Sequence, residues 1–505
     1  MCGLLCIVKP SPKRKNIKKA LLLMQHRGPD YTGEYTDENI YLGHNRLSII
    51  DLNDRSNQPY YHNGYRIIYN GEIYNYKELI AEHNLKPSTK SDTEVILLMY
   101  MKYGSKCLNF FNGMFTFIIY NKEKNQIFVA RDRLGIKPLY YKTIGEEIIF
   151  ASEISSILQL SPDEFDEFGI RQYRKLRMTL DGYTLYKGIK VFKPGHYMLN
   201  SQFIRYWSLK IDRKPEPDLD HLFWLINDSV NLRKRSDVPI GSYLSGGLDS
   251  TILSYILKPN FTWTVGFKEM NEFYWSDLAN KNLNSEHKKI IIDENTFIDT
   301  AKWMINKRKE PLSVPNEVLI YLMTRHVKKE NTVILSGEGA DELFLGYDRI
   351  FRWANESKNL SLAEFDSKYA YGSHKDDEVL DFALSGLPGK TVFDKISYFF
   401  QIKHLQGLLR RLDNSTMLCS VEARVPFVDH RLVELIGGTS FEWRMKNSVK
   451  DPLKKLFYKI IPDEIIQREK VGFPVPLDLI FKNYNYKKGK PMDAWLEFNL
   501  NQLID

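Results

Sequence analysis

A cysteine at position 2 is the first residue of this sequence whose type and position suggest chemistry. If Met1 is removed, Cys2 becomes the terminal residue and its α-amino group lies beside its own thiol. That amine has an ordinary pKa of about 7.7–8.0, so near neutrality it can take the thiol proton and activate the sulfur as a nucleophile. Taken alone, a cysteine at position 2 is more often a chance occurrence, so the hypothesis depends on the residues that follow.

Five motifs follow Cys2 in order along the chain. They are HRGPD (26–30), GHNRLSIID (43–51), YNGEIYN (69–75), KSDTE (90–94) and RDRLGIKPLYY (131–141). Together with Cys2 they resemble the class II glutamine amidotransferases, whose glutaminase domain has an N-terminal-nucleophile fold. The resemblance implies that Cys2 attacks the side-chain amide of glutamine.

The same resemblance assigns an oxyanion hole to the Asn70 side-chain amide and the Gly71 backbone N–H, which place donors where negative charge develops. The alternative for Asn70-Gly71 is a plain hairpin turn. The second cysteine of the strand, Cys6, is expected to pack away from the site and has no assigned role.

The resemblance also implies a binding site for the two charged ends of glutamine. Arg46 would pair with the α-carboxylate, a task suited to a guanidinium fork, and the alternative for Arg46 is a surface ion pair. Glu72 and Asp92 would hold the α-ammonium.

A glycine-rich turn marks a second site. SGGLDS (245–250) lies between a predicted strand, Pro239–Leu244, and a predicted helix, Thr251–Leu257. Backbone N–H groups of such a turn can surround an anion at a helix N-terminus, although a tight strand–helix connection is the alternative. The motif resembles the pyrophosphate loop of ATP pyrophosphatases and lacks the lysine of a Walker loop.

LSGEGADE (335–342) again joins a predicted strand to a predicted helix. It brings three carboxylates, Glu338, Asp341 and Glu342, toward a phosphate site, which predicts Mg²⁺ between them and ATP. VEARVPFVD (421–429) and REKVGF (468–473) follow. From Cys2 to about Pro476 the chain resembles the glutamine-hydrolysing asparagine synthetases.

This second resemblance implies roles by motif. The residues that would hold pyrophosphate are Ser245, Gly246, Gly247, Asp249 and Ser250. The residues that would line the adenosine site are Leu244, Val265, Ser336 and Gly337. The residues that would reach Mg²⁺ are Asp249 and Asp341. Glu338 would guide or deprotonate ammonia. Lys450 would neutralise phosphate charge, although Asp451-Pro452 is expected to interrupt the helix there and a surface lysine is the alternative.

The implied reaction is ATP-dependent synthesis of asparagine from aspartate through a β-aspartyl-AMP intermediate, with ammonia supplied by glutamine hydrolysis. Two departures leave the acceptor open. Asn271-Glu272 stands where the family often has Asp-Glu, and residues 310–316 keep Glu310-Pro311 but lack a later acid. The alternative is a related glutamine-dependent amidotransferase that amidates another carboxylate.

The elements that must position these residues fall into two classes. Short strands at Gly3–Val8, Arg66–Asn70, Phe115–Tyr120 and Gln126–Ala130, with turn signals that include Asn70-Gly71, predict a β-rich first part. Strands at Pro239–Leu244, Thr262–Phe267 and Thr332–Leu335, alternating with helices, predict a parallel sheet. From about Leu360 onward helical periodicity dominates.

We therefore expect an α/β and α+β chain: an αββα N-terminal-nucleophile sandwich (1–207), a linker (208–219) and a parallel-sheet nucleotide-binding domain with a helical C-terminal part (220–505). Four cysteines without a C-x-x-C pair and a net charge of +8 predict neither a disulfide framework nor a zinc site, and no nucleic-acid or membrane partner. A cytoplasmic enzyme is expected, and a homodimer is compatible with the resemblance.

Overall fold

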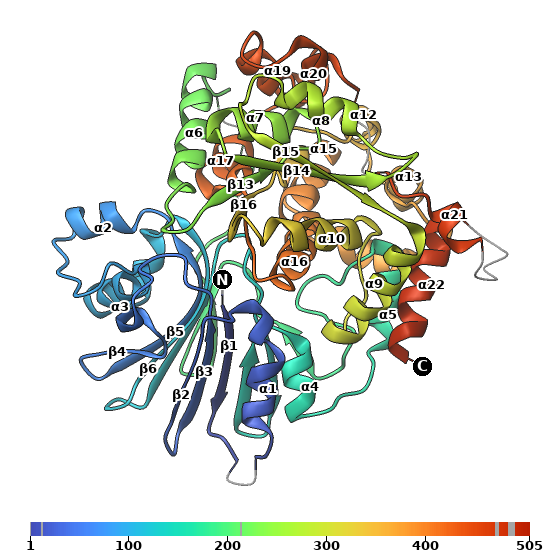
Figure 1. The fold of residues 1–505 in the computed structure, drawn as a ribbon. Coiled ribbons are helices and arrows are strands. Elements are labelled where there is room, and N and C mark those ends of the chain that lie inside the picture. Colours follow the sequence, from blue (N-terminus) through green and yellow to red (C-terminus); the bar gives the residue numbers. More distant parts are fainter. Residues whose placement is uncertain (1, 12–13, 213–214, 470–473, 483–489, 505) are drawn as a thin grey trace.

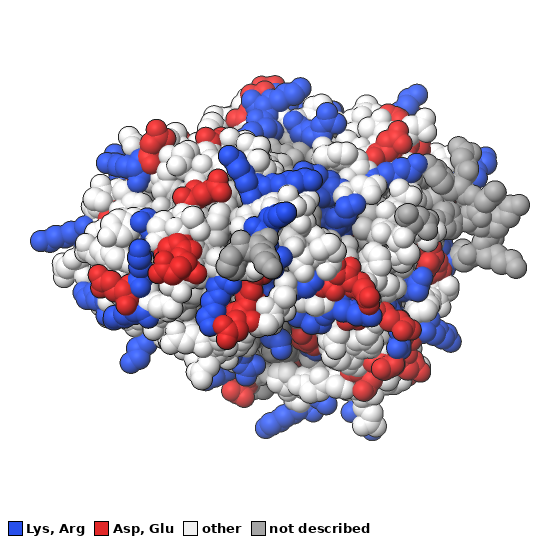
Figure 2. Space-filling view, turned by 90° about the horizontal axis from the view of Figure 1, so that it is seen from below, with Lys and Arg blue, Asp and Glu red and all other residues white. Residues whose placement is uncertain are grey.

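The computed structural model describes residues 2–11, 14–212, 215–469, 474–482 and 490–504. An N-terminal sandwich packs against a larger α/β part, and the N-terminus lies where the two meet (Figure 1). Acidic and basic side chains are interspersed over the face seen in Figure 2, in keeping with the small net charge of +8. Among the described residues, no helix is long and apolar enough to cross a membrane.

The N-terminal part is built on two six-stranded antiparallel sheets. The first has the order β10-β8-β9-β1-β3-β2, with bounds β1 Gly3–Val8, β2 Tyr31–Thr36, β3 Ile40–Arg46, β8 Tyr140–Ile144, β9 Glu147–Ala151 and β10 Ile189–Val191. The second has the order β12-β11-β7-β6-β5-β4, with bounds β4 Tyr60–His62, β5 Tyr65–Ile73, β6 Gly113–Asn121, β7 Gln126–Arg131, β11 His196–Leu199 and β12 Gln202–Arg205.

Helices cover the outer faces of both sheets. Helices α1 (Ile17–Leu23) and α4 (Ile154–Leu160) contact the first sheet, and α3 (Asp92–Tyr103), preceded by α2 (Tyr76–Glu82), contacts the second. Along β1, Leu4 and Cys6 point into one buried cluster while Leu5 and Ile7 point into another, as the two-residue period of a strand requires. The predicted αββα sandwich and the packing of Cys6 are confirmed.

The C-terminal part is built on a five-stranded parallel sheet of order β15-β14-β13-β16-β17. Its bounds are β13 Ile240–Tyr243, β14 Phe261–Phe267, β15 Glu286–Ile292, β16 Val333–Leu335 and β17 Glu422–Arg424. The helices between and around the strands are α6 Leu219–Leu232, α7 Leu248–Leu257, α8 Phe273–Asn280, α9 Glu294–Arg308 and α10 Asn316–Val327, whereas α5 Glu167–Leu176 of the N-terminal part contacts helices α14 (Asp377–Leu384) and α22 (Pro491–Ile504). The predicted parallel sheet is confirmed.

The rest of the chain is mainly helical, as predicted. Its helices are α11 Ala340–Leu343, α12 Asp348–Glu356, α13 Leu362–Tyr369, α14 Asp377–Leu384, α15 Val392–Tyr398, α16 Leu405–Met417, α17 His430–Ile436, α18 Phe441–Met445, α19 Asp451–Phe457, α20 Asp463–Gln467, α21 Leu477–Phe481 and α22 Pro491–Ile504. Strand β17 is the exception that the helical periodicity did not predict. It contains only three residues, too few to show an alternation.

Two further sequence expectations are wrong. Asn70-Gly71 is not a turn, because both residues lie inside β5 and pair with Thr116 and Phe115 of β6. The glycine is needed there for close approach, since a Cβ on Gly71 would lie 2.0 Å from the Met114 carbonyl oxygen.

The Asp451-Pro452 pair does not interrupt a helix either. Helix α19 begins at Asp451 with the proline in its first turn, where the missing N–H has no intrahelical partner to lose. Lys450, directly before it, has φ of 59°.

Candidate active sites

Cys2 lies at the start of β1, where it is 7% exposed. Its backbone N–H donates to Asn70 Oδ1 at 3.0 Å, which joins the first strand of one sheet to β5 of the other. Asn70 is fully buried, and within the described residues its Nδ2 has no hydrogen-bond acceptor. A buried amide donor without an acceptor beside a thiol is the arrangement that an oxyanion would satisfy.

The thiol of Cys2 is not activated by burial. Burial raises its pKa, while the Leu47 backbone N–H and the charge of Arg46 act in the opposite direction. A base beside the sulfur is therefore needed, and removal of Met1 would supply one as the terminal amine of Cys2. Met1 lies outside the described residues.

Arg46 is 4% exposed at the end of β3, so the alternative of a surface ion pair is wrong. Its Nη1 donates to Asn57 Oδ1 at 2.8 Å and to the Asn53 carbonyl at 3.1 Å. Its Nη2 donates to the carbonyls of Asp51 at 2.5 Å and Ile50 at 3.3 Å. These described acceptors are carbonyl oxygens, so they hold the guanidinium in place without neutralising its charge.

The two acids predicted to bind the glutamine α-ammonium lie near each other and are buried. Asp92 Oδ2 accepts from Tyr69 Oη at 2.8 Å and from the Ile73 N–H at 2.9 Å. Burial raises the pKa of Asp92 to about 6. Burial, followed by repulsion from Glu422 and Asp92, raises the pKa of Glu72 well above its ordinary range.

Sequence reasoning missed two residues at this pocket. Arg424 and Glu422 of β17 reach it from the C-terminal sheet, with Arg424 Nη2 3.6 Å from Glu72 Oε1. The available signal was two charges alternating inside the otherwise apolar run VEARVPFV.

At the second site, the turn after β13 is held by its own serines. Ser245 Oγ lies 3.1 Å from Ser250 Oγ, and the Gly247 N–H donates to Ser245 Oγ at 3.3 Å. Gly246 has φ of 74°, and a Cβ there would lie 2.3 Å from the Trp275 backbone. The turn therefore depends on glycine, and it leads directly into α7 at Leu248.

Lys450 joins this turn to the LSGEGADE segment. Its Nζ lies 2.5 Å from Asp249 Oδ2 and 2.6 Å from Asp341 Oδ1. Burial alone would lower the pKa of Lys450, but the two carboxylates outweigh burial and raise it. Because Lys450 is 6% exposed, the alternative of a surface lysine is wrong.

The three acids of this segment lie around Tyr347, whose pKa is raised by burial and by the charges of Glu342, Asp341 and Glu338, but their side chains have different partners. Asp341 faces Lys450, whereas Glu338 Oε1 accepts from Arg411 Nη2 at 2.8 Å and Glu342 Oε1 accepts from Tyr347 Oη at 2.5 Å. Within the described ranges no group of three or more acidic, histidine or cysteine side chains could hold a metal ion. The two predicted metal residues, Asp249 and Asp341, both contact Lys450 Nζ.

The predicted adenosine residues lie at one edge of the parallel sheet. Leu244, Val265 and Ser336 are buried at or just beyond the ends of β13, β14 and β16. A Cβ on Gly337 would lie 3.0 Å from the Asp249 Cβ, so the two glycine-rich segments touch. The carboxyl edge of a parallel sheet is where nucleotides bind in α/β folds.

A cavity of about 320 Å³ opens beside Glu338. Arg411, the partner of Glu338, lines it, together with residues 313–316 of the segment that departs from the family pattern. Asn271, the other departure, instead donates to the Phe267 and Lys268 carbonyls. Residues 470–473 of the REKVGF motif lie outside the described residues.

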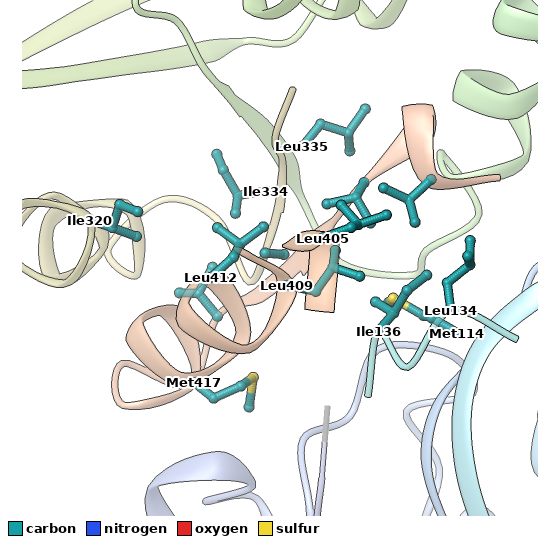
Figure 3. Close-up of a cluster of buried hydrophobic side chains, with 14 of the residues drawn as sticks. Met114, Leu134, Ile136, Ile320, Ile334, Leu335, Leu405, Leu409, Leu412 and Met417 are labelled. Atoms are coloured by element: carbon teal, nitrogen blue, oxygen red, sulfur yellow. The ribbon is translucent and has the colours of Figure 1, made fainter. Parts of the chain in front are cut away.

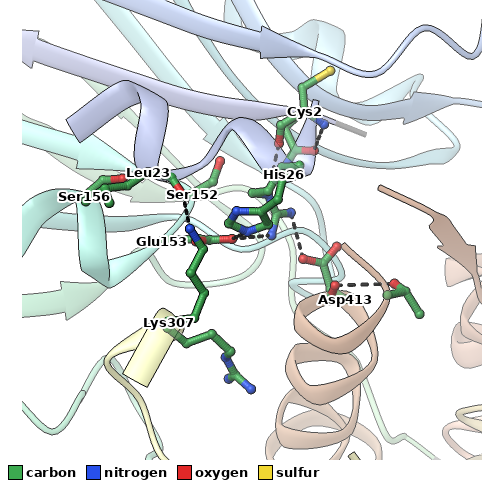
Figure 4. A network of polar contacts seen from close by, with 12 residues as sticks. Cys2, Leu23, His26, Ser152, Glu153, Ser156, Lys307 and Asp413 are labelled. Atoms are coloured by element: carbon green, nitrogen blue, oxygen red, sulfur yellow. Dashed lines mark hydrogen bonds and ion pairs between the residues drawn. The ribbon is translucent and has the colours of Figure 1, made fainter. Parts of the chain in front are cut away.

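A buried polar network connects the first site to the C-terminal part (Figure 4). Arg27 Nε donates to the Cys2 carbonyl at 3.2 Å, and its Nη2 donates to Asp413 Oδ2 of α16 at 2.8 Å. Lys137 Nζ lies 3.2 Å from the other Asp413 oxygen, and Glu153 contacts Arg27 at 3.3 Å. The backbone of the nucleophile is thereby tied to a helix of the other domain.

Comparison with known proteins covers both parts. A family model described as Glutamine amidotransferase domain matches residues 1–207, and one described as Asparagine synthase matches residues 222–488. Asparagine synthetase [glutamine-hydrolyzing] 1 of Bacillus subtilis (strain 168) is 32% identical over 96% of this chain and 88% of its own length. Asparagine synthetase [glutamine-hydrolyzing] 3 of the same organism is 29% identical, over 94% and 85% respectively.

Asparagine synthetase B [glutamine-hydrolyzing] of Escherichia coli (strain K12) is 28% identical over 91% of this chain and 79% of its own length. The two family models together account for both candidate sites, the pocket at Cys2 and the edge of the parallel sheet. This chain therefore belongs to the asparagine synthase family, with a glutamine amidotransferase domain at its N-terminus.

Proposed function

We propose that this chain is a two-site carbon–nitrogen ligase that makes L-asparagine from L-aspartate, ATP and the amide nitrogen of L-glutamine. The observation that carries the proposal is the contact of Lys450 with both Asp249 and Asp341 at the carboxyl edge of the parallel sheet. This contact brings together three segments that are distant in the sequence. At that point a cation and two acids can interact with the charged groups of a triphosphate. The sandwich at 1–207 would be the glutaminase and residues 220–505 the synthetase.

In the glutaminase, the Cys2 sulfur would attack the glutamine amide carbon after its proton passes to the terminal amine. The oxyanion would accept hydrogen bonds from Asn70 Nδ2 and the Gly71 N–H. The terminal ammonium returns its proton to the leaving nitrogen, and ammonia leaves. Water then hydrolyses the thioester to glutamate and regenerates the thiol.

In the synthetase, an oxygen of the aspartate β-carboxylate would attack the α-phosphorus of ATP. Pyrophosphate leaves into the turn formed by residues 245–250, and Lys450 offsets its charge. Ammonia then attacks the acyl carbon of β-aspartyl-AMP, AMP leaves, and Glu338 takes the proton released from nitrogen.

Mg²⁺ is the ion expected at this site. Asp249 and Asp341 fit it, because both already face one cation and present the hard oxygen ligands that Mg²⁺ prefers. Bound there, Mg²⁺ would offset phosphate charge and orient the leaving pyrophosphate. The homodimer stays a prediction, which light scattering would test.

The ammonia route follows from the packing between the domains. Met114, Leu134 and Ile136 of the N-terminal part lie in the same buried apolar cluster as Leu405 and Leu409 of the C-terminal part (Figure 3). We infer that ammonia crosses this apolar interface, because in water at neutral pH it would become ammonium, which is not a nucleophile.

The test is formation of asparagine, AMP and pyrophosphate in equal amounts from aspartate, ATP and glutamine. Cys2→Ala should abolish the glutamine-dependent reaction and leave the reaction with added ammonia intact. Retention of glutamine-dependent synthesis would refute the role of Cys2. Pyrophosphate release with other carboxylates, but none with aspartate, would instead support the alternative acceptor.

A further inference from the structure

The glutamine pocket has a wall that comes from the C-terminal domain. Strand β17 carries Glu422 and Arg424, both fully buried, to the pocket formed by β5 and α3 of the sandwich. Arg424 Nε donates to Glu422 Oε1 at 2.6 Å, and its Nη1 donates to the carbonyls of Arg233 at 2.8 Å and Arg235 at 2.7 Å. The position of the Arg424 side chain is therefore fixed by contacts within the C-terminal domain.

Among the described residues, the acidic side chains of this pocket outnumber the guanidinium groups that contact them. Glu72, Asp92 and Glu422 are three buried carboxylates, and Arg424 is the guanidinium that contacts two of them. The neighbouring cations are engaged elsewhere, because Arg233 pairs with Asp429 at 3.1 Å and Arg235 pairs with Glu78 at 2.5 Å. Buried carboxylates need a cation, and the α-ammonium of glutamine would supply one.

Two distances decide which carboxylate remains available to that ammonium. Arg424 is 2.6 Å from Glu422 but 3.6 Å from Glu72, which is beyond hydrogen-bond length. The Arg424 guanidinium is thus held by Glu422 and faces Glu72 without forming a hydrogen bond to the Glu72 oxygens. Burial and the charge of Glu422 raise the pKa of Glu72, so a cation bound beside Glu72 would favour its ionised form.

We propose, resting on the function proposed above, that Glu422 and Arg424 are positioning residues of the glutamine site. Glu422 holds Arg424 away from Glu72, and the pair thereby leaves Glu72 free to bind the α-ammonium. The glutaminase pocket is then complete only when the C-terminal domain is docked. The Ser336 N–H donates to the Arg424 carbonyl at 2.9 Å, so the same strand also borders the ATP site.

The test is Glu422→Gln in the full chain, because glutamine keeps an oxygen for Arg424 Nε but removes the charge. Arg424 should then turn toward Glu72 and compete with the ammonium. We expect the KM for glutamine in the hydrolysis reaction to rise about tenfold while kcat changes by less than about threefold. Ammonia-dependent synthesis should stay at the wild-type rate.

A second substrate separates positioning from general damage. Glutaramate, the glutamine analogue without an α-amino group, has no cation for Glu72, so its KM should be the same in Glu422→Gln and wild type. The matched control is Glu434→Gln, which changes a carboxylate of the same domain that accepts from Trp207 at 2.6 Å. It should alter neither KM.

The second variant is Arg424→Lys, which keeps the positive charge but loses the planar guanidinium and its several N–H donors. It should also raise the KM for glutamine selectively. An equal rise for glutamine and glutaramate, an unchanged glutamine KM, or loss of ammonia-dependent synthesis in both variants would overturn the proposal. If the wild-type protein itself hydrolyses no glutamine, the proposed glutaminase fails instead, which keeps the two failures distinguishable.

Discussion

At the scale of single residues, Lys450 has the surroundings that most constrain the second site. It is buried and contacts Asp249 and Asp341, which come from segments about 200 and 110 residues away along the chain. Burying a charge is costly unless it is paired, so this lysine holds its place because both acids face it.

We expect Lys450→Met to reduce pyrophosphate release by at least about a hundredfold, the usual order for losing a group that stabilises developing charge. Glutamine hydrolysis at Cys2 should persist, because the substitution leaves that pocket intact. The measurement is pyrophosphate formation against glutamate formation, with exposed Lys459→Met as the matched control. Equal synthesis rates in the two variants would contradict the role given to Lys450.

Asp92 makes the first site sensitive to pH. Burial raises its pKa to about 6, and only its ionised form can pair with the α-ammonium of glutamine. As pH falls through 6 the carboxylate is protonated, so kcat/KM for glutamine hydrolysis should fall with it. The profile for glutaramate, which lacks the ammonium, should lack this step, and a shared step would assign the titration to another group.

At the scale of elements, β5 carries the proposed oxyanion donors where it packs closely against β6. Asn70 and Gly71 lie within the strand rather than at its end, opposite Thr116 and Phe115 of β6. A strand held in register by β6 positions donors more rigidly than a hairpin loop could.

Gly71→Ala should therefore damage both stability and glutaminase activity. The new Cβ would lie 2.0 Å from the Met114 carbonyl, at a φ of 151°, so β5 and β6 must separate. We expect a loss of about 2–4 kcal/mol in the free energy of unfolding and loss of glutamine hydrolysis.

Gly145→Ala is the matched control, because Gly145 has φ of 60° but nothing within 4 Å of an added Cβ. It should cost only about 1 kcal/mol, from the backbone preference alone. Thermal unfolding of both variants separates the steric effect from the conformational one, and equal losses would refute the close-approach argument.

At the scale of the whole molecule, a buried interface that is partly polar and partly apolar lies between the two sites. Asp413 of α16 pairs with Arg27 at 2.8 Å and with Lys137 at 3.2 Å, and Arg27 in turn holds the Cys2 carbonyl. The apolar cluster of Figure 3 continues the interface toward the synthetase.

Asp413→Asn should loosen this interface. Two buried cations would lose their shared carboxylate, although Arg27 keeps Glu153, so we expect a loss of about 3 kcal/mol in stability. Ammonia should then escape, and the ratio of glutamate to asparagine formed should rise above one. A ratio that stays at one in the variant would show that this contact does not maintain coupling.

The parts of the fold that could be predicted from the sequence are those whose signals are local. Gly3–Val8 was predicted with the bounds that the structure has, and the two glycine-rich motifs were placed correctly between strands and helices. Such signals depend on residues within one element, so neighbouring side chains and backbone preferences are sufficient.

Which charges meet depended on the tertiary structure. It gave Glu338, Asp341 and Glu342 different partners, placed Asn70-Gly71 inside a strand, and brought Arg424 of β17 to Glu72 of β5, about 350 residues apart in the chain. These contacts are fixed by how two separate sheets pack and by which buried charges must find partners. No window along the chain contains that information, because the partners are neighbours only after the domains have docked.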